Sequence, residues 1–254
     1  MLAPASLLFL GTASIGIGVL IGAVGVGGVL LVPVLIYCTP LDVHQAMATA
    51  LASFVATGLV GTLAFHRRGS VDWAFAAPLC VGAMICSYLG AVVNAGLAAD
   101  TLMAVLAVLI VGAGIYTILS PAAVSGPPAT GWRRSQYGLL FVLGAISGFS
   151  SGLTGTGGPL VAVPLMILCG FPALTAIGAS QVLQVLAALS GTAGNLLHGS
   201  IAVSLLPLVI VLEVAGVVVG VRLIHAVNAV LVRKLVAWLC LIIGAGMLAR
   251  EILS

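Results

Sequence analysis

Charged residues are nearly absent from this sequence. Only 5% of its 254 residues are Asp, Glu, Lys or Arg, whereas 62% are hydrophobic. A soluble domain carries about 25% charged residues, so this scarcity excludes a soluble globular protein. The net charge of +3 is small and is divided among several loops, so it does not indicate binding to nucleic acid.

Recognisable catalytic and metal-binding signatures are missing as well. The sequence has no HExxH motif for a zinc protease, and Asp42, Asp72 and Asp100 stand singly at the ends of apolar runs instead of forming a catalytic pair. The five cysteines form no CxxC pair and have no histidine at the spacing of a metal site. We therefore predict that the chain is not an enzyme and that it holds no cofactor and no metal.

What the sequence has in abundance is long, continuous apolar runs. They fall at 5–37, 43–65, 71–97, 101–119, 136–169, 173–197, 201–224 and 229–252. A membrane helix needs about 20 apolar residues, whereas the strands of a membrane barrel alternate apolar and polar residues over about ten. The runs therefore predict an all-α polytopic membrane protein.

The chain consists of two similar halves. At an offset of 130 residues, "GAVGVGG" at 22–28 aligns with "GLTGTGG" at 152–158, and "GTLAFHRRGSV" at 61–71 aligns with "GTAGNLLHGSI" at 191–201. The one long polar stretch rich in proline and glycine lies between the halves. We predict a first membrane repeat at 1–120, a polar linker at 121–135 and a second membrane repeat at 136–254, an internal duplication typical of transporters.

Each half opens with a run of unusual length. Runs of 33 and 34 residues are too long for one crossing and too short for two. We predict that each opening run is a re-entrant hairpin that dips to the middle of the membrane and turns at its glycines. Each half then crosses three times and the repeats are inverted, which places seven of the eight Lys and Arg residues on one side, whereas four crossings would divide them five to three. The positive-inside rule favours the inverted arrangement, with both termini outside.

The glycine blocks also identify a family. "GAVGVGGVLLVP" and "GLTGTGGPLVAVP", with the paired G-T…G-S loops, resemble the TauE/SafE family of sulfite and organosulfonate exporters over essentially the whole chain. The resemblance implies a secondary transporter in the bacterial inner membrane that exports a small sulfur-containing anion, driven by an ion gradient. Its partners would be that anion, membrane lipid and a proton as coupling ion, and a homo-oligomer is compatible with it. An anion channel remains an alternative, as does an importer of a compound such as thiosulfate that uses Cys38 and Cys169 as a thiol relay.

The glycine blocks and the few polar residues inside the runs are the candidates for the site. Helix ends exposed at a hairpin turn offer N–H groups that bind an anion without a charged side chain, although glycines can also serve only to pack helices closely. Thr49, Ser53 and Thr57 share one helix face, as do Ser180 and Gln184. The expected substrate-binding residues are Gly25, Gly27, Gly28, Thr49, Ser53, Ser151, Thr154, Gly155, Thr156, Gly157, Gly158, Ser180, Gln181 and Gln184.

One acidic residue stands in the middle of an apolar run. Glu213 lies in "LVIVLEVAGVV", where a charged side chain is costly and usually serves a function. We expect Glu213 to carry the coupling proton. The alternative is a structural role, in which a permanently protonated carboxyl bonds to a neighbouring helix.

Overall fold

The architecture, seen in a computed structural model, consists of helices joined by turns, with no strand among the residues that the structure describes, namely 4–24, 27–119, 134–197, 201–223 and 229–253. The predicted Gly25 lies outside these residues. In chain order the elements are α1 (Pro4–Val24), η1 (Gly28–Leu30), α2 (Leu31–Cys38), α3 (Val43–Arg67), α4 (Trp73–Gly96), α5 (Ala99–Leu119), α6 (Arg134–Thr154), α7 (Pro159–Leu168), α8 (Ala173–Leu197), α9 (Leu206–Leu223) and α10 (Ala229–Leu253).

Helices α1, α3, α4, α5, α6 and α8 are long and apolar enough to cross a membrane. The 18 residues of α9 are also almost entirely apolar, and α10 has 25 residues. The predicted all-α polytopic class is therefore confirmed. Each half has the same order of elements, a long helix, a short helix and three long helices, but a duplicated origin for the halves stays a prediction.

The opening segments differ from the predicted hairpins in one respect. Helices α1 and α6 have 21 residues each, which corresponds to about 31 Å and is enough for a full crossing. The shorter arms are 28–38 and α7, so the two arms of each hairpin are unequal. Each long arm could therefore cross the membrane by its length, but the glycine turns that follow the long arms lie against Phe54 at the middle of α3. The predicted turn at mid-membrane stays a prediction.

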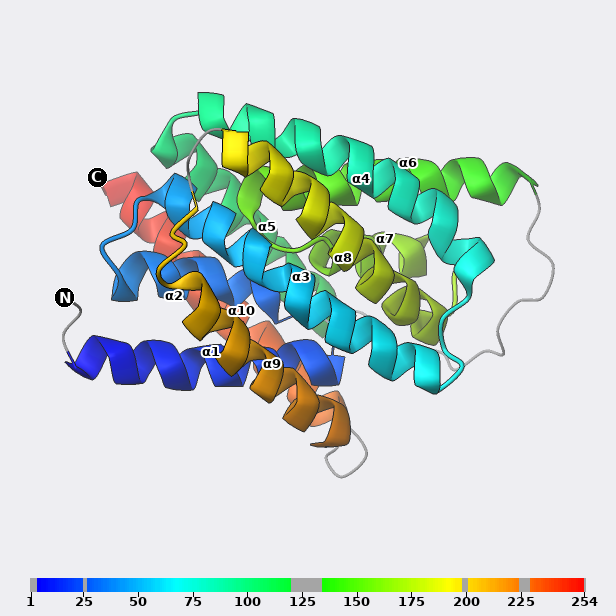
Figure 1. The fold of residues 1–254 in the computed structure, drawn as a ribbon, viewed down its shortest axis with the longest axis horizontal. Helices are drawn as coiled ribbons and strands as arrows, with labels where there is room; N and C mark the ends of the chain where they lie inside the picture. Colours follow the sequence, from blue (N-terminus) through cyan, green and yellow to red (C-terminus); the bar gives the residue numbers. More distant parts are fainter. Residues whose placement is uncertain (1–3, 25–26, 120–133, 198–200, 224–228, 254) are drawn as a thin grey trace.

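The direction of the helices agrees with an inverted arrangement. In Figure 1 the N-terminus, the C-terminus, the end of α2 and the start of α3 lie at one end of the molecule, whereas α6 starts and α7 ends at the other. Each opening segment therefore returns to the end from which it started. The end that holds the end of α3 and the starts of α6 and α10 also carries most of the basic residues. These are Arg67, Arg68, Arg134, Arg222, Arg233 and Lys234, with Arg250 at the opposite end.

Two helix pairs lie at opposite edges of the molecule, each joining one helix from each half. Helix α9 crosses α1 at one edge, and α4 lies along α6 at the other (Figure 1). A Cβ atom on Gly22 would collide with the backbone of Val217, and a Cβ atom on Gly152 would collide with the backbone of Ser87. Gly22 and Gly152 thus bring backbones into contact, as small residues do in membrane helix pairs.

We expect the loops after α3 and α8 to lie on opposite sides of the membrane. In a variant without native cysteines, a cysteine at exposed Gly69 should react with an impermeant thiol reagent only from the cytoplasm, and a cysteine at exposed Val203 only from the outside. Labelling of whole cells and of inverted vesicles measures this. Reaction of both positions from the same side would instead support parallel repeats with four crossings each.

Candidate functional site

A small cavity lies at the middle of the two central helices, α3 and α8. It is enclosed by the first residues of two short helices together with side chains from α3, α8 and the second glycine turn, residues 155–158. The lining residues are Gly28, Val29, Phe54, Thr156, Pro159, Leu160 and Gln184. The volume open to the centre of a water molecule is about 10 Å³, roughly enough for one water. The structure therefore shows this cavity in a closed form.

Both short helices begin at the cavity. Gly28 and Val29 start η1, which continues into α2, while Pro159 and Leu160 start α7. The first N–H groups of a helix lack partners within it and, with the helix dipole, favour negative charge. Two helix N-termini thus meet at one uncharged cavity, an arrangement that discontinuous helices provide for anionic substrates in transporters.

The polar side chains at the cavity belong to Gln184 and Thr156. The Gln184 amide nitrogen donates to the Thr57 hydroxyl at 3.0 Å and approaches the Phe54 carbonyl oxygen at 3.4 Å. Thr156 lies in the second glycine turn, and its hydroxyl pairs with that of Thr154 at 3.0 Å. The structure therefore brings three predicted residues, Gly28, Thr156 and Gln184, to one cavity.

Phe54 is a cavity residue that sequence reasoning missed. Its ring is fully buried and lies against both glycine turns. A Cβ atom on Gly28 would be 2.8 Å from its Cζ, and one on Gly157 would be 2.8 Å from its Cδ2. The available signal was its position, since Phe54 matches Gln184 at the offset of 130 residues and is an aromatic residue at the centre of its helix.

The glycines of the two turns have different structural roles. In the second turn, Gly155, Gly157 and Gly158 have φ angles of 69°, 84° and 82°, a conformation that favours glycine. In the first turn, Gly27 has a φ of −106°, and a Cβ atom there would lie 2.7 Å from the Leu20 Cβ on α1. Gly27 therefore lets the short arm pack on the long arm and does not line the cavity.

The other predicted polar residues are buried but do not line the cavity. Thr49 accepts a hydrogen bond from the Ala202 backbone, and Ser53 and Ser180 donate to carbonyls within their own helices. Gln181 reaches towards Gly61 on α3, and its amide nitrogen has no partner among the described residues. Their predicted contact with substrate is not visible in this closed form and stays a prediction.

Two hydroxyl-bearing residues of α6 lie close to the second glycine turn. Ser151 is fully buried, and its hydroxyl has no partner in the described part of the chain. A Cβ atom on Gly158 would be 3.9 Å from that hydroxyl oxygen. Thr154 donates to the Ser150 carbonyl at 2.7 Å. Both residues therefore neighbour the turn that encloses the cavity, although neither forms its wall.

Glu213 is fully buried near the middle of α9. Neither of its carboxyl oxygens has a hydrogen-bond partner among the residues that the structure describes. The Ser53 hydroxyl lies beside the carboxyl group, and Ser53 stands one turn before Thr57, the partner of Gln184. Two buried hydroxyl groups of α3, one turn apart, thus lie next to Glu213 and next to Gln184, respectively.

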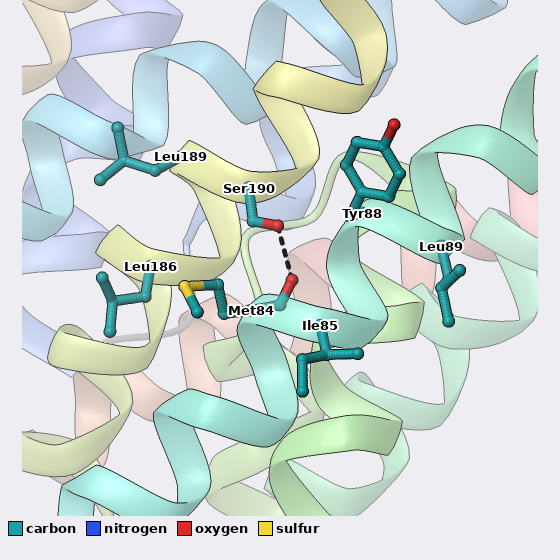
Figure 2. Close-up of a pocket in the computed structure, with 7 residues that line it drawn as sticks. All are labelled: Met84, Ile85, Tyr88, Leu89, Leu186, Leu189 and Ser190. Carbon is teal, nitrogen blue, oxygen red and sulfur yellow. Dashed lines mark hydrogen bonds between the residues drawn. The ribbon is translucent and has the colours of Figure 1, made fainter.

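A larger groove on the outer face of α4 and α8 has a different character. Its volume is about 590 Å³, and six of its seven lining residues are apolar or aromatic. Figure 2 shows that the Ser190 hydroxyl bonds to the Met84 carbonyl, at 2.5 Å. Ile85, Leu89 and Leu189 are each 50% exposed, so the groove is a lipid-facing surface and offers an anion no cation.

The chain is similar to known membrane transporter proteins. A family model described as "Sulfite exporter TauE/SafE" matches residues 9–247. The chain is 24% identical over 228 residues to the probable membrane transporter protein YdhB of Bacillus subtilis, covering 86% of this chain and 90% of that relative. It is 25% identical over 227 residues to the probable membrane transporter protein YfcA of Escherichia coli K12, covering 88% and 82%. No solved structure matches the chain.

Proposed function

Because this chain belongs to the sulfite exporter TauE/SafE family and is a multi-pass transporter of the bacterial inner membrane, we propose that it exports a small sulfur-containing anion, such as sulfite or an organosulfonate, in exchange for or together with protons. The observation that carries this proposal is the meeting of two helix N-termini at one central cavity. Backbone N–H groups at these helix starts would receive the anion, and the Gln184 amide and Thr156 hydroxyl would orient its oxygens.

A carrier agrees with the closed cavity better than an open channel does. A conducting pore needs a continuous path, whereas this cavity holds roughly one water molecule. The two glycine turns, the Phe54 ring and Gln184 seal it at the centre of the molecule. Transport therefore requires a conformational change that opens the cavity to one side at a time, as in alternating access.

The alternative of a thiol-relaying importer finds no support in the positions of its two cysteines. Cys38 is the last residue of α2 and Cys169 follows α7, and these helix ends lie at opposite ends of the molecule (Figure 1). Neither cysteine lines the cavity. A substrate at the cavity would therefore not meet either thiol.

Glu213 is the residue that supports coupling to protons. It is fully buried, the Ser53 hydroxyl lies beside its carboxyl group, and neither carboxyl oxygen accepts a hydrogen bond within the described part of the chain. A bare carboxylate at such depth is costly, so the side chain is stable there when it carries a proton. Movement of α9 that exposes Glu213 to water would let it release that proton.

We expect purified protein in liposomes to move sulfite or an organosulfonate with saturable kinetics, and a pH gradient to accelerate the flux. The measurement uses a panel of sulfite, sulfoacetate, thiosulfate and sulfate, with and without the gradient, and protein-free liposomes as the control. Flux that rises linearly without saturation would indicate a channel, and transport of thiosulfate alone would move the proposal to that substrate.

A further inference from the structure

We infer that the Phe54 side chain sets the size of the anion that the central cavity accepts, a role that rests on the proposed transport function for its substrate class. Phe54 is the largest of the seven lining residues, and its ring lies where the two glycine turns approach each other. No charged group lines the cavity, so discrimination between anions of equal charge there depends on shape and hydrogen bonding.

The neighbours of the ring explain why it closes the cavity. Gly28 lies so close to the ring that a Cβ atom on it would be 2.8 Å from the Phe54 Cζ. A Cβ atom on Gly157 would likewise be 2.8 Å from the Phe54 Cδ2. A side chain on either turn would displace the ring. The two glycines therefore leave room for a flat aromatic ring between the turns. With the ring in place, the cavity has space for about one water molecule.

The ring is also the part of the wall best suited to move. Gly28, Pro159 and Leu160 enclose the cavity at the starts of helices, so their displacement requires movement of the backbone. Gln184 is held by Thr57 at 3.0 Å. The Phe54 ring, in contrast, has no hydrogen-bonding group, so rotation of the side chain would vacate space without breaking a hydrogen bond. The space so vacated would fix the largest anion that fits beside Gln184 and Thr156.

Shortening Phe54 should therefore admit larger anions. In liposomes, the ratio of sulfoacetate flux to sulfite flux should rise at least about tenfold in Phe54→Ala and several-fold in Phe54→Leu, because loss of a few carbon atoms in a pocket changes discrimination by about 10–200-fold. Phe75→Leu is the matched control, since Phe75 is as fully buried as Phe54 but belongs to a separate hydrophobic cluster. There its ring packs edge-on against the Phe171 ring, with 5.0 Å between the ring centroids. An unchanged ratio in folded Phe54→Leu and Phe54→Ala would overturn the inference.

A second measurement decides the role of the ring without any transported substrate. In a variant without native cysteines, Thr156→Cys would place a thiol in the cavity wall, where the native residue is 3% exposed. Sulfonatoethyl methanethiosulfonate, an anionic thiol reagent, should react with it slowly, and at least about tenfold faster when Phe54→Ala is added, since the ring would no longer exclude the reagent. Equal rates would contradict the inference. If the wild type moves no anion of the panel but the labelling rates differ, the proposed substrate class fails and the role of Phe54 in limiting the size of an anion in the cavity stands.

Discussion

Replacing Glu213 with glutamine is expected to reduce the flux that a pH gradient drives by at least about tenfold. Exchange of substrate across the membrane should continue. Glutamine preserves the size and hydrogen-bonding capacity of the protonated acid but has no proton to release. The binding cavity is lined by other residues and stays intact. Exchange requires only that the substrate-bound protein changes conformation. Net flux requires in addition that the substrate-free protein changes conformation after the coupling group has released its proton.

The coupling should also be visible in binding. An anion in the cavity and a negative carboxylate nearby repel each other, so substrate and proton should bind together. Each must then strengthen the binding of the other by the same factor. In Glu213→Gln, substrate affinity should lose its dependence on pH, which equilibrium binding to the detergent-solubilised protein can measure.

The matched control for this experiment is Asp100→Asn. It is the same change from carboxyl to amide, made at an exposed position in the first turn of α5. Flux in Asp100→Asn should keep its pH dependence. If Glu213→Gln also transports with an unchanged pH dependence, Glu213 is structural and another group carries the proton.

Gly157→Ala is expected to reduce transport at least about tenfold without preventing membrane insertion. Gly157 has a φ of 84°, which costs an alanine about 1–2 kcal/mol. The added Cβ atom would also lie 2.8 Å from the Phe54 ring, which has Gly28 on its other side. The second glycine turn or the ring must therefore shift, and both enclose the proposed binding cavity.

Gly170→Ala separates these two effects. Gly170 has the same φ of 84°, but a Cβ atom there would meet nothing within 4 Å. The two variants should lose similar thermal stability from the backbone alone, while only Gly157→Ala loses transport. Flux measured at matched protein density in liposomes makes the comparison. Equal loss of flux in both variants would show that backbone strain, and not the contact with Phe54, is responsible.

The sequence predicted much of the fold because its signals were local. Apolar length identified the membrane helices, and the two glycine blocks located the turns. The lengths of the hairpin arms were not predictable in the same way. Where a helix ends before a glycine block depends on tertiary packing, and Gly22 and Gly152 remain helical because α9 and α4 pack against them.

The candidate site was predictable only in part for a related reason. Gln184 and Thr156 could be identified as candidates because polar residues are rare in these apolar runs, and both line the cavity. Thr49 and Ser180 satisfy the same criterion but bond to nearby backbone groups. Phe54 carries no such signal, since an aromatic residue in an apolar run is ordinary. Its importance arises from two glycine turns that lie far apart in the sequence and meet at its ring.

The pairing of α1 with α9 has a consequence for biosynthesis. Helix α1 is made about 180 residues before α9, so the face that carries Gly22 has no partner while the intervening chain is synthesised. At about 5–20 residues per second, that delay is roughly ten to forty seconds. During this time a strip of small residues is exposed to lipid and to other nascent helices, and a chain truncated before α9 would keep it uncovered. Such truncated chains should be recognised and degraded by membrane proteases, whereas α4 meets α6 early and is protected sooner.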